Sequence, residues 1–498
     1  MSVFPTSSIG LPKSLNYDLP PSASDSCRSY SVNLSPDGIT SVVCPTFIPF
    51  PAANTLLQPP FNSQVVSFTI PSGNSNSVFL DPQHTTLSFS LTYTVGTAAV
   101  AVGTVAKLLS SVASFFDQLV LYSNNAPLEQ VNQYGLLQNF LLQNTVNVAE
   151  RYGGVSIAMG CDSNSASGIE LGIAATSYKY NFSIPLLSMI GINSEKLFPV
   201  GMLNNLQLQM TTSTLLPCIF YNAGFTSAAA IPVLFTLSEF SLNMKYVDIG
   251  DVASSMLLST LQNNGILYKT STYTNSQVTI PSGSSGSQQL LLQIRNTSVK
   301  SVFHQFGMSN AVAANALIAP NGYYDAIGIG CNSRQLQIGG SFFPNKPIND
   351  ISRASEGYIF LIQALGGSIP KSLGTVINKE MYCTLGAIGA QPTGSNIETF
   401  IQLPVNVAGT TPLVRPTPSG ANASNAEIIN YPSGHFLGYD LERLGGVMFS
   451  GFNTRSTPPF LNLNLGYALT ATVTCNAWGY SDVILTFDLG SKSVQAFI

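Results

Sequence analysis

The chain of 498 residues is long for a single hydrophobic core, and only 8% of its residues are charged, with a formal net charge of −4. Single cores stop growing at roughly 250–300 residues, so two large domains are expected. Soluble proteins carry about 25% charged residues, so we expect other subunits to cover much of the surface, although a secreted neutral β-protein would share this composition. The slightly negative net charge argues against a protein that wraps nucleic acid, because phosphate binding relies on clustered Lys and Arg.

Neither a targeting segment nor a membrane span is expected. The first residues, MSVFPTSSIGLPKSL, contain two prolines and lack the apolar core of a secretory signal. No run of about 18 apolar residues occurs, so the chain should not cross a membrane. The seven cysteines are widely spaced without a CxxC pair. They are interpreted as free buried thiols rather than as a disulfide framework.

Residues 1–62 are expected to form an extended arm, because they hold ten of the thirty prolines of the chain. Proline fixes φ and removes a backbone donor, so this segment cannot form a central strand. We expect a neighbouring domain or subunit to hold the arm in place.

Short strands are predicted from Gln64 onward, where runs of β-branched and aromatic residues are bounded by turn residues. In TTLSFSLTYTV, apolar side chains recur at every second position from Leu87 to Val95, which is typical of a strand with one buried face. Further strands are predicted at VVSFTI (65–70), SVFL (77–80), Ser177 to Leu186, Asn205 to Thr212 and Val233 to Ile249.

One amphipathic helix is predicted in each half. In SFFDQLVLYSNNAPLEQVNQYGLLQNFLL (114–142), a strand-like run and a turn lead into apolar residues at helical spacing. The resulting stripe should dock against its own barrel or the adjacent one, and it consists of Leu128, Val131, Tyr134 and Leu137. The second helix is predicted within Ile351 to Leu365, capped by Asn349 or Asp350 at its start and by Gly366 at its end.

Three features recur in the same order in both halves, which suggests a duplicated domain with diverged loops. TIPSG occurs at 69–73 and at 279–283, a helical run follows each copy, and FSIP (182–185) resembles FIQLP (400–404). The predicted organisation is an arm (1–62), a first domain (63–250), a linker (251–275) and a second domain (276–498).

No residues are arranged for catalysis, metal binding or cofactor binding, so no catalytic, metal or cofactor residue is predicted and the chain is not expected to be an enzyme. It has no GxSxG elbow, no HExxH, no paired cysteines and no phosphate-binding Gly-Lys loop. The three histidines (His84, His304 and His435) are interpreted as turn or packing residues. Trp478 lies in a strand-like run, and packing is favoured over a platform for a sugar ring.

These motifs and their order resemble the double jelly-roll major capsid proteins, especially those of polintons, polinton-like viruses and virophages. FFDQLVLYSNNAPLEQVNQYGLLQNFLL (115–142) is similar to the first-domain signature of that family. FSIPLLSMIGINSEKLFPVGMLNNLQLQM (182–210) is similar to the later part of the same domain, and residues 451–487 to the last strands of the second. The resemblance covers residues 64–498 and leaves out the arm.

The resemblance implies an all-β chain of two tandem eight-stranded jelly rolls, with a short helix inserted in each. It implies a major capsid protein whose homotrimers form pseudo-hexameric capsomers that tile an icosahedral capsid around a DNA genome. The implied partners are neighbouring capsomers and minor capsid proteins (penton or cement), without sequence-specific contacts to nucleic acid. The implied location is the virion capsid, after synthesis and assembly in the host cell, and a membrane beneath the capsid is compatible with it.

Two other hypotheses belong to different classes. A β-sandwich that binds carbohydrate or acts as an adhesin is the alternative to a capsid protein. A β-rich hydrolase is the third, and nothing in the sequence nominates its pair of carboxylates.

Overall fold

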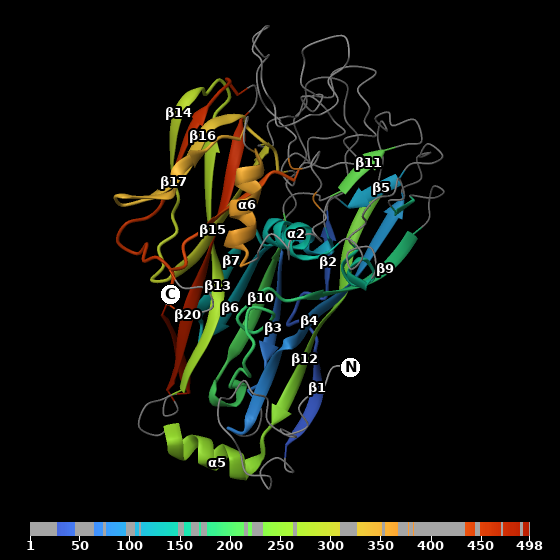
Figure 1. Cartoon of the computed structure of the whole chain (residues 1–498). Coiled ribbons are helices and arrows are strands. Elements are labelled where there is room, and N and C mark those ends of the chain that lie inside the picture. The colour runs from blue at the N-terminus through green and yellow to red at the C-terminus, as the bar shows by residue number, and fades with distance from the viewer. Residues whose placement is uncertain are drawn as a thin grey trace, which may run out of the picture.

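The chain forms two β-sheet units that lie side by side, the first drawn blue to green and the second yellow to red in Figure 1. The computed structural model describes residues 27–44, 64–72, 76–95, 105–108, 111–147, 154–160, 169–170, 177–213, 218–221, 233–261, 266–308, 326–350, 354–366, 377, 382, 434–443, 449–469, 472–488 and 492–497.

Each unit is built from two antiparallel sheets. In the first unit the sheets have the orders β1-β12-β4-β9 and β3-β10-β6-β7. Their bounds are β1 (Arg28–Leu34), β3 (Val65–Ile70), β4 (Val78–Val95), β6 (Phe116–Ser123), β7 (Ala126–Asn132), β9 (Ser177–Pro185), β10 (Leu206–Thr212) and β12 (Val233–Asp248). In the second unit the orders are β13-β20-β15-β18 and β14-β19-β16-β17. Their bounds are β13 (Ile266–Ile280), β14 (Gly286–Leu291), β15 (Val299–Met308), β16 (Cys331–Ile338), β17 (Ser341–Ile348), β18 (Phe436–Asp440), β19 (Phe460–Leu465) and β20 (Val473–Asp488).

Both units have the strand order of a jelly roll. When the eight main strands of each unit are numbered along the chain, one sheet reads 1-8-3-6 and the other 2-7-4-5 in both units. The predicted fold, two tandem eight-stranded jelly rolls with a helix inserted in each, is therefore confirmed. We call the units roll 1 (residues 28–248) and roll 2 (residues 266–488).

The remaining elements extend or connect the rolls. β2 (Ser41–Cys44) adds to β12, and β21 (Ser493–Phe497) adds to β20. A small third sheet is formed by β5 (Val105–Leu108), β8 (Ile169–Glu170) and β11 (Cys218–Tyr221). The helices are η2 (Val112–Phe115), α2 (Tyr134–Thr145), α4 (Gly154–Met159), η3 (Val200–Met202), α5 (Gly250–Leu261) and α6 (Ala354–Ala364). Helix α5 connects the rolls and lies below them in Figure 1.

The period-two pattern of the strands fills the interior of each roll. Leu87, Phe89 and Leu91 on β4 are buried, as their alternation predicts. The ring of Phe89 lies 5.4 Å from that of Phe116 on β6, so the two sheets of roll 1 meet through these side chains. Burying each such side chain contributes about 1.5–3 kcal/mol to folding.

The expected arm is wrong for its described part, because residues 28–34 and 41–44 are strands of roll 1. β1 pairs with β12 from Arg28↔Asp248 to Leu34↔Leu242 and is the first strand of the jelly roll. It lies at the sheet edge, where flanking prolines are tolerated, so averaging composition over 62 residues concealed a proline-free strand. β13 begins at Ile266, inside the expected linker. We therefore propose that the first domain begins at Arg28 and the second at Ile266.

The predicted first helix begins too early. Asn124 and Asn125 have φ values of 50° and 64°, which is the geometry of a two-residue hairpin turn, and the next residues return as β7 beside β6. Leu128 and Val131 therefore lie in a strand, and α2 begins only at Tyr134. In the second half the predicted helix and its end at Gly366 (φ 72°) are confirmed.

The TIPSG repeat does not mark equivalent positions, although the fold is duplicated. The first copy ends β3, the second strand of roll 1, whereas the second copy ends β13, the first strand of roll 2. The two helices are equivalent, because α2 and α6 each lie between the fifth and sixth strands of their roll. The third proposed correspondence, at residues 400–404, lies outside the described residues.

Removing residues 1–44 should lower the stability of roll 1 further than removing residues 1–26 does, because only the first deletion takes away β1 and β2. Residues 28–44 hold Val42, which is buried, and Val32 and Leu34, which pack against the core. Losing their burial costs about 4 kcal/mol or more, so the melting temperature should fall by about 10 °C. Differential scanning fluorimetry of the two deletions tests this, and equal melting temperatures would contradict the assignment of β1 to the roll.

Candidate functional site: the seam between the two rolls

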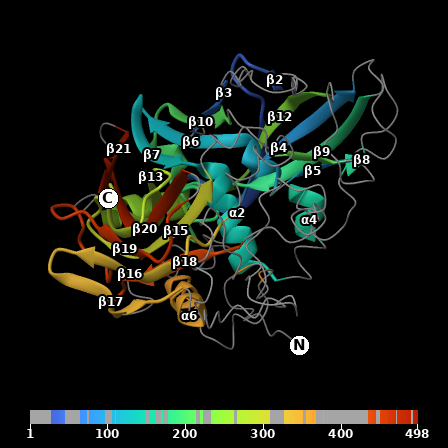
Figure 2. The same ribbon diagram turned by 90° about the horizontal axis from the view of Figure 1, so that it is seen from above.

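Helix α2 lies between the two rolls and is buried on almost every side (Figures 1 and 2). On the side of roll 1 it approaches η2 so closely that a Cβ on Gly135 would lie 2.5 Å from the Cα of Ser114. The helix starts after Gln133, whose φ of 53° turns the chain out of β7. Only glycine permits this backbone contact.

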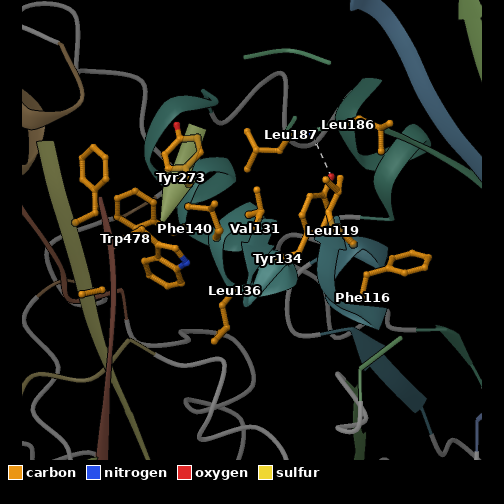
Figure 3. Packing of buried hydrophobic residues seen from close by; sticks show 14 of the residues in the cluster. Phe116, Leu119, Val131, Tyr134, Leu136, Phe140, Leu186, Leu187, Tyr273 and Trp478 are labelled. Carbon is orange, nitrogen blue, oxygen red and sulfur yellow. Dashed lines mark hydrogen bonds between the residues drawn. The ribbon is translucent and has the colours of Figure 1, made fainter. Parts of the chain in front are cut away.

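On the side of roll 2, Phe140 of α2 inserts among three aromatic side chains, and Figure 3 shows it beside one of them, Trp478. Its ring centroid lies 5.0 Å from Phe303, 5.2 Å from Phe436 and 6.2 Å from Trp478, and these belong to β15, β18 and β20. Aromatic pairs at such distances add about 0.5–1.5 kcal/mol each beyond the area they bury. The predicted docking of the helix is thus confirmed, and it contacts both its own roll and the adjacent one.

Tyr134, at the first position of α2, fixes the helix to the segment that follows β9. Its hydroxyl accepts hydrogen bonds from the backbone N–H of Leu187 (3.1 Å) and from Nε2 of Gln138 (3.2 Å). Gln138 also donates to the carbonyl of Pro185 at 3.3 Å. Burial raises the pKa of Tyr134 to about 12, so the phenol stays neutral and keeps these contacts.

Glu129 of β7 is a buried carboxylate that joins three segments. Its Oε2 accepts from Oγ of Ser188 (2.5 Å) and from the N–H of Met189 (2.8 Å), and its Oε1 accepts from Oγ1 of Thr272 on β13 (2.8 Å). Burial raises its pKa to about 7, although all three hydrogen bonds act in the opposite direction. The side chain therefore links roll 1 to roll 2 while it lies close to the boundary between its two protonation states.

Below α2, residues 193–204 of roll 1 pack along β13 and β20. The carbonyl of Asn193 accepts from Oγ of Ser271 at 3.3 Å, and the Tyr268 hydroxyl donates to the carbonyl of Lys196 at 2.8 Å. Phe198 meets the rings of Tyr268 (5.3 Å) and Phe487 (5.6 Å). We call the contacts of α2, Glu129 and residues 186–204 with roll 2 the seam; they make one block of two rolls.

Roll 2 contains a second buried charged cluster. Nε of Arg334 on β16 donates to Oδ1 of Asp350 at 2.5 Å, and both side chains are fully buried. Burial alone would raise the pKa of Asp350, but the Arg334 guanidinium reverses this and lowers it. Arg334 also lies against α6, since a Cβ on Gly357 would come 2.4 Å from its Nη2. The cluster fixes α6 to its own roll, and Asp350 pairs with Arg334 instead of capping the helix.

Two of the three histidines singled out in the sequence, His304 and His435, lie in the buried cluster of Arg334 and Asp350, and Nε2 of His435 is 3.8 Å from Oδ2 of Asp350. His84 is exposed and pairs with Asp81 at 2.8 Å, whereas His304 and His435 are buried in roll 2. Burial, and then the nearby Arg334, lowers the pKa of His304 well below its ordinary value, so it packs as a neutral ring. Nδ1 of His435 makes a 2.8 Å hydrogen bond with the carbonyl oxygen of Tyr382.

The other sequence features have structural surroundings. Trp478 is fully buried at the seam, as predicted for a packing residue. Cys331 and Cys475 are free buried thiols, and burial raises the pKa of both. Within the described residues, no group of three or more His, Cys, Asp or Glu side chains is placed to hold a metal ion. In the same part of the chain, no helix has the length and apolarity needed to span a membrane.

Sequence reasoning missed Glu129 and Arg334, and it assigned Asp350 to helix capping instead of to an ion pair. An isolated acid inside the apolar run PLEQV was the only available signal for Glu129, and its partners are 59 to 143 residues away. In β16, CNSRQLQI, Arg334 lies on the same face of the strand as Leu336 and Ile338, which indicates an inward position. The sequence of the strand does not identify the partner carboxylate.

The fold is similar to that of chains in solved virus and virophage structures. One similar structure is PBCV-1 VP54, in a crystal structure fitted into a cryo-EM reconstruction of the virophage Sputnik. The match covers 95% of this chain and 97% of VP54, with 10% sequence identity and a TM-score of 0.52. A chain of the cryo-EM structure of the Sputnik virophage matches with 11% identity and a TM-score of 0.53, over 95% of this chain and 88% of that one. The crystal structure of the mavirus major capsid protein matches with 11% identity and a TM-score of 0.48, over 92% of this chain and 90% of the mavirus chain. No protein-family model and no curated protein matches the chain.

Replacing Gly135 with Ala should destabilise the protein, because the new methyl group would collide with backbone that cannot move aside. We expect a loss of about 2–3 kcal/mol in the free energy of unfolding. Gly154→Ala is the matched control, since a Cβ there meets no atom within 4 Å and alanine favours helix. Urea denaturation followed by tryptophan fluorescence measures both, and equal stability of the two variants would contradict the close approach of α2 and η2.

Replacing Glu129 with Gln should remove a pH dependence of stability. Because the pKa of Glu129 rises from its ordinary value of 4.5 to about 7 in the fold, the stabilising contribution is complete below the lower value and is lost as pH rises through the higher one. Between about pH 5 and pH 8, the wild type should lose about 2–3 kcal/mol of unfolding free energy relative to E129Q. The measurement is urea denaturation across that range, with exposed Glu195→Gln as the control. Parallel curves for wild type and E129Q would show that Glu129 titrates normally.

Proposed function

We propose that this chain is the major capsid protein of a DNA virus, and that its homotrimers are pseudo-hexameric capsomers of an icosahedral capsid. The observation that carries the proposal is the pair of rolls with identical strand order, joined by the seam into one block. The likeness in fold to Sputnik-related capsid structures over 95% of the chain supports it.

The physical argument is one of symmetry. Each chain contributes two similar rolls, so three chains arranged in a closed ring contribute six rolls. Such a ring has a nearly hexagonal outline and can sit among six neighbours. The rolls must keep their mutual orientation for this purpose, and the buried contacts of Phe140 and Glu129 across the seam supply that rigidity.

The proposed role is structural and not enzymatic. The buried ionisable groups of the described residues serve packing, since Glu129 joins the rolls and Arg334 with Asp350 fixes α6. Neighbouring capsomers and minor capsid proteins of the penton or cement type are the proposed partners, and the virion capsid assembled in the host cell is the proposed location. The low charge fits a shell protein that leaves contact with the genome to others.

The alternative of a carbohydrate-binding sandwich gains no support from the residue nominated for it. Trp478 is the single tryptophan of the chain, and it stacks against Phe140 and is fully hidden from solvent. An indole in that position cannot stack on a sugar ring at the surface.

The proposed function predicts the mass of the purified protein and the assemblies that it forms. Three chains of 52.8 kDa give a particle of about 158 kDa in size-exclusion chromatography with light scattering. Electron microscopy of concentrated trimers should show closed shells or hexagonal sheets. A folded chain that stays monomeric at high concentration, with a single melting transition, would overturn the proposal.

A further inference from the structure

The outward face of one sheet in roll 1 carries a group of hydrogen-bonded neutral amides and hydroxyls, beside the exposed side chain of Val65. On β10, Gln207 donates from Nε2 to Oγ of Ser67 on β3 at 2.7 Å, and Gln209 donates to Oε1 of Gln207 at 3.3 Å. On β6, Gln118 donates to Oδ1 of Asn132 on β7 at 2.7 Å. These side chains are partly exposed, while the residues between them on β10 fill the core.

The corresponding sheet of roll 2 has the same chemistry at corresponding strands. Gln289 on β14 donates from Nε2 to Oδ1 of Asn462 on β19 at 3.0 Å, and Asn462 donates to Oε1 of Gln337 on β16 at 2.9 Å. β10 and β19 are both the seventh strand of their roll, and β6 and β16 are both the fourth. We call these two outward surfaces the amide faces.

Charged side chains are sorted onto the other pair of sheets. The sheet of β4, β9 and β12 has Lys179 paired with Glu239 at 2.5 Å, and the sheet of β15 and β20 has Lys300 paired with Asp482 at 3.1 Å. Within the sheets of the amide faces, Glu129 on β7 and Arg334 on β16 are buried on the inner side. Three other charged side chains of the described residues stand at the margins: Asp37 in a turn beside β3, Asp117 at the start of β6, and Lys346 on the edge strand β17. The sorting is therefore a property of the sheets and not only of the low overall charge.

A surface of this kind suits contact with an identical surface. An amide has both a donor and an acceptor, so one array of Gln and Asn can pair with a second copy of itself. Burying neutral amides that keep hydrogen bonds costs far less than burying charges. Figure 2 places β3, β10 and β6 on one side of the molecule and β16 and β17 on another, while β7 lies beside β13 at the seam.

We propose that the two amide faces are the surfaces through which one trimer of this chain contacts the next, so that the partner is a second copy of the chain. The proposal rests on the proposed function, because it assigns the lateral contacts of the capsomer to these two sheets. Its main support is that both rolls have amide side chains at this surface although their sequences have diverged. A surface without a partner would not require the two rolls to keep the same side-chain chemistry.

The test places a negative charge on each face with Gln209→Glu and Gln337→Glu in one chain. Trimers should form with unchanged mass and melting temperature, while the yield of shells or sheets in electron microscopy should fall about tenfold or more, because like charges meet at the contact. Ser282→Glu with Ser285→Glu, two exposed positions in the turn after β13, is the matched control and should assemble as the wild type does.

Mixing supplies the second measurement. Trimers with Gln209→Lys and Gln337→Lys should also assemble poorly alone, and mixing them with the Glu trimers should restore assembly, because opposite charges then face each other. Normal assembly of the Glu variant, or no recovery of assembly on mixing, overturns the assignment of the amide faces. The proposed function still stands in that case if the wild type forms trimers and shells. If the wild type forms neither trimers nor shells, the proposed function fails and this proposal fails with it.

Discussion

Helix α2 must fit two rolls at once, and the arrangement of the whole chain depends on that constraint. One side of the helix touches backbone at Ser114, where only Gly135 leaves enough room. The opposite side carries Phe140 into the aromatic group of β15, β18 and β20. Because protein interiors are close-packed and yield little, a helix held on both sides fixes the distance and the angle between the rolls.

Polar contacts along the seam add specificity that apolar packing lacks. Glu129 requires Ser188, Met189 and Thr272 to be present together, since each donor lost leaves a buried carboxylate less satisfied. A small rotation of one roll would misalign the three directed hydrogen bonds on the carboxylate, so they add a requirement on orientation to the packing of α2. Its pKa rises because burial of the carboxylate outweighs the three hydrogen bonds that it accepts from neutral donors.

Much of the fold could be predicted from the sequence, because alternation on β4 and the end of α6 at Gly366 are local signals. The hairpin at Asn124 and Asn125 is also local, but Leu128 and Val131 fit both a helix and a strand, and the apolar spacing was read as helical. β1 was missed because its partner β12 lies more than 200 residues away. The seam residues could not be predicted, since Glu129 and Thr272 meet only after both rolls have formed.

The two helices show how a duplicated chain acquires two different boundaries. α2 and α6 occupy the same place in their rolls, yet α2 is covered by both rolls, whereas α6 buries Gly357, Leu361 and Ala364 and exposes Gln363. In the proposed ring of six rolls, boundaries within a chain would therefore alternate with boundaries between chains. The first kind is fixed by covalent linkage and by Phe140, so its packing can be hydrophobic and permanent. The second kind has to form between separate chains, and α6, which is less covered than α2, would be one of the surfaces available for it.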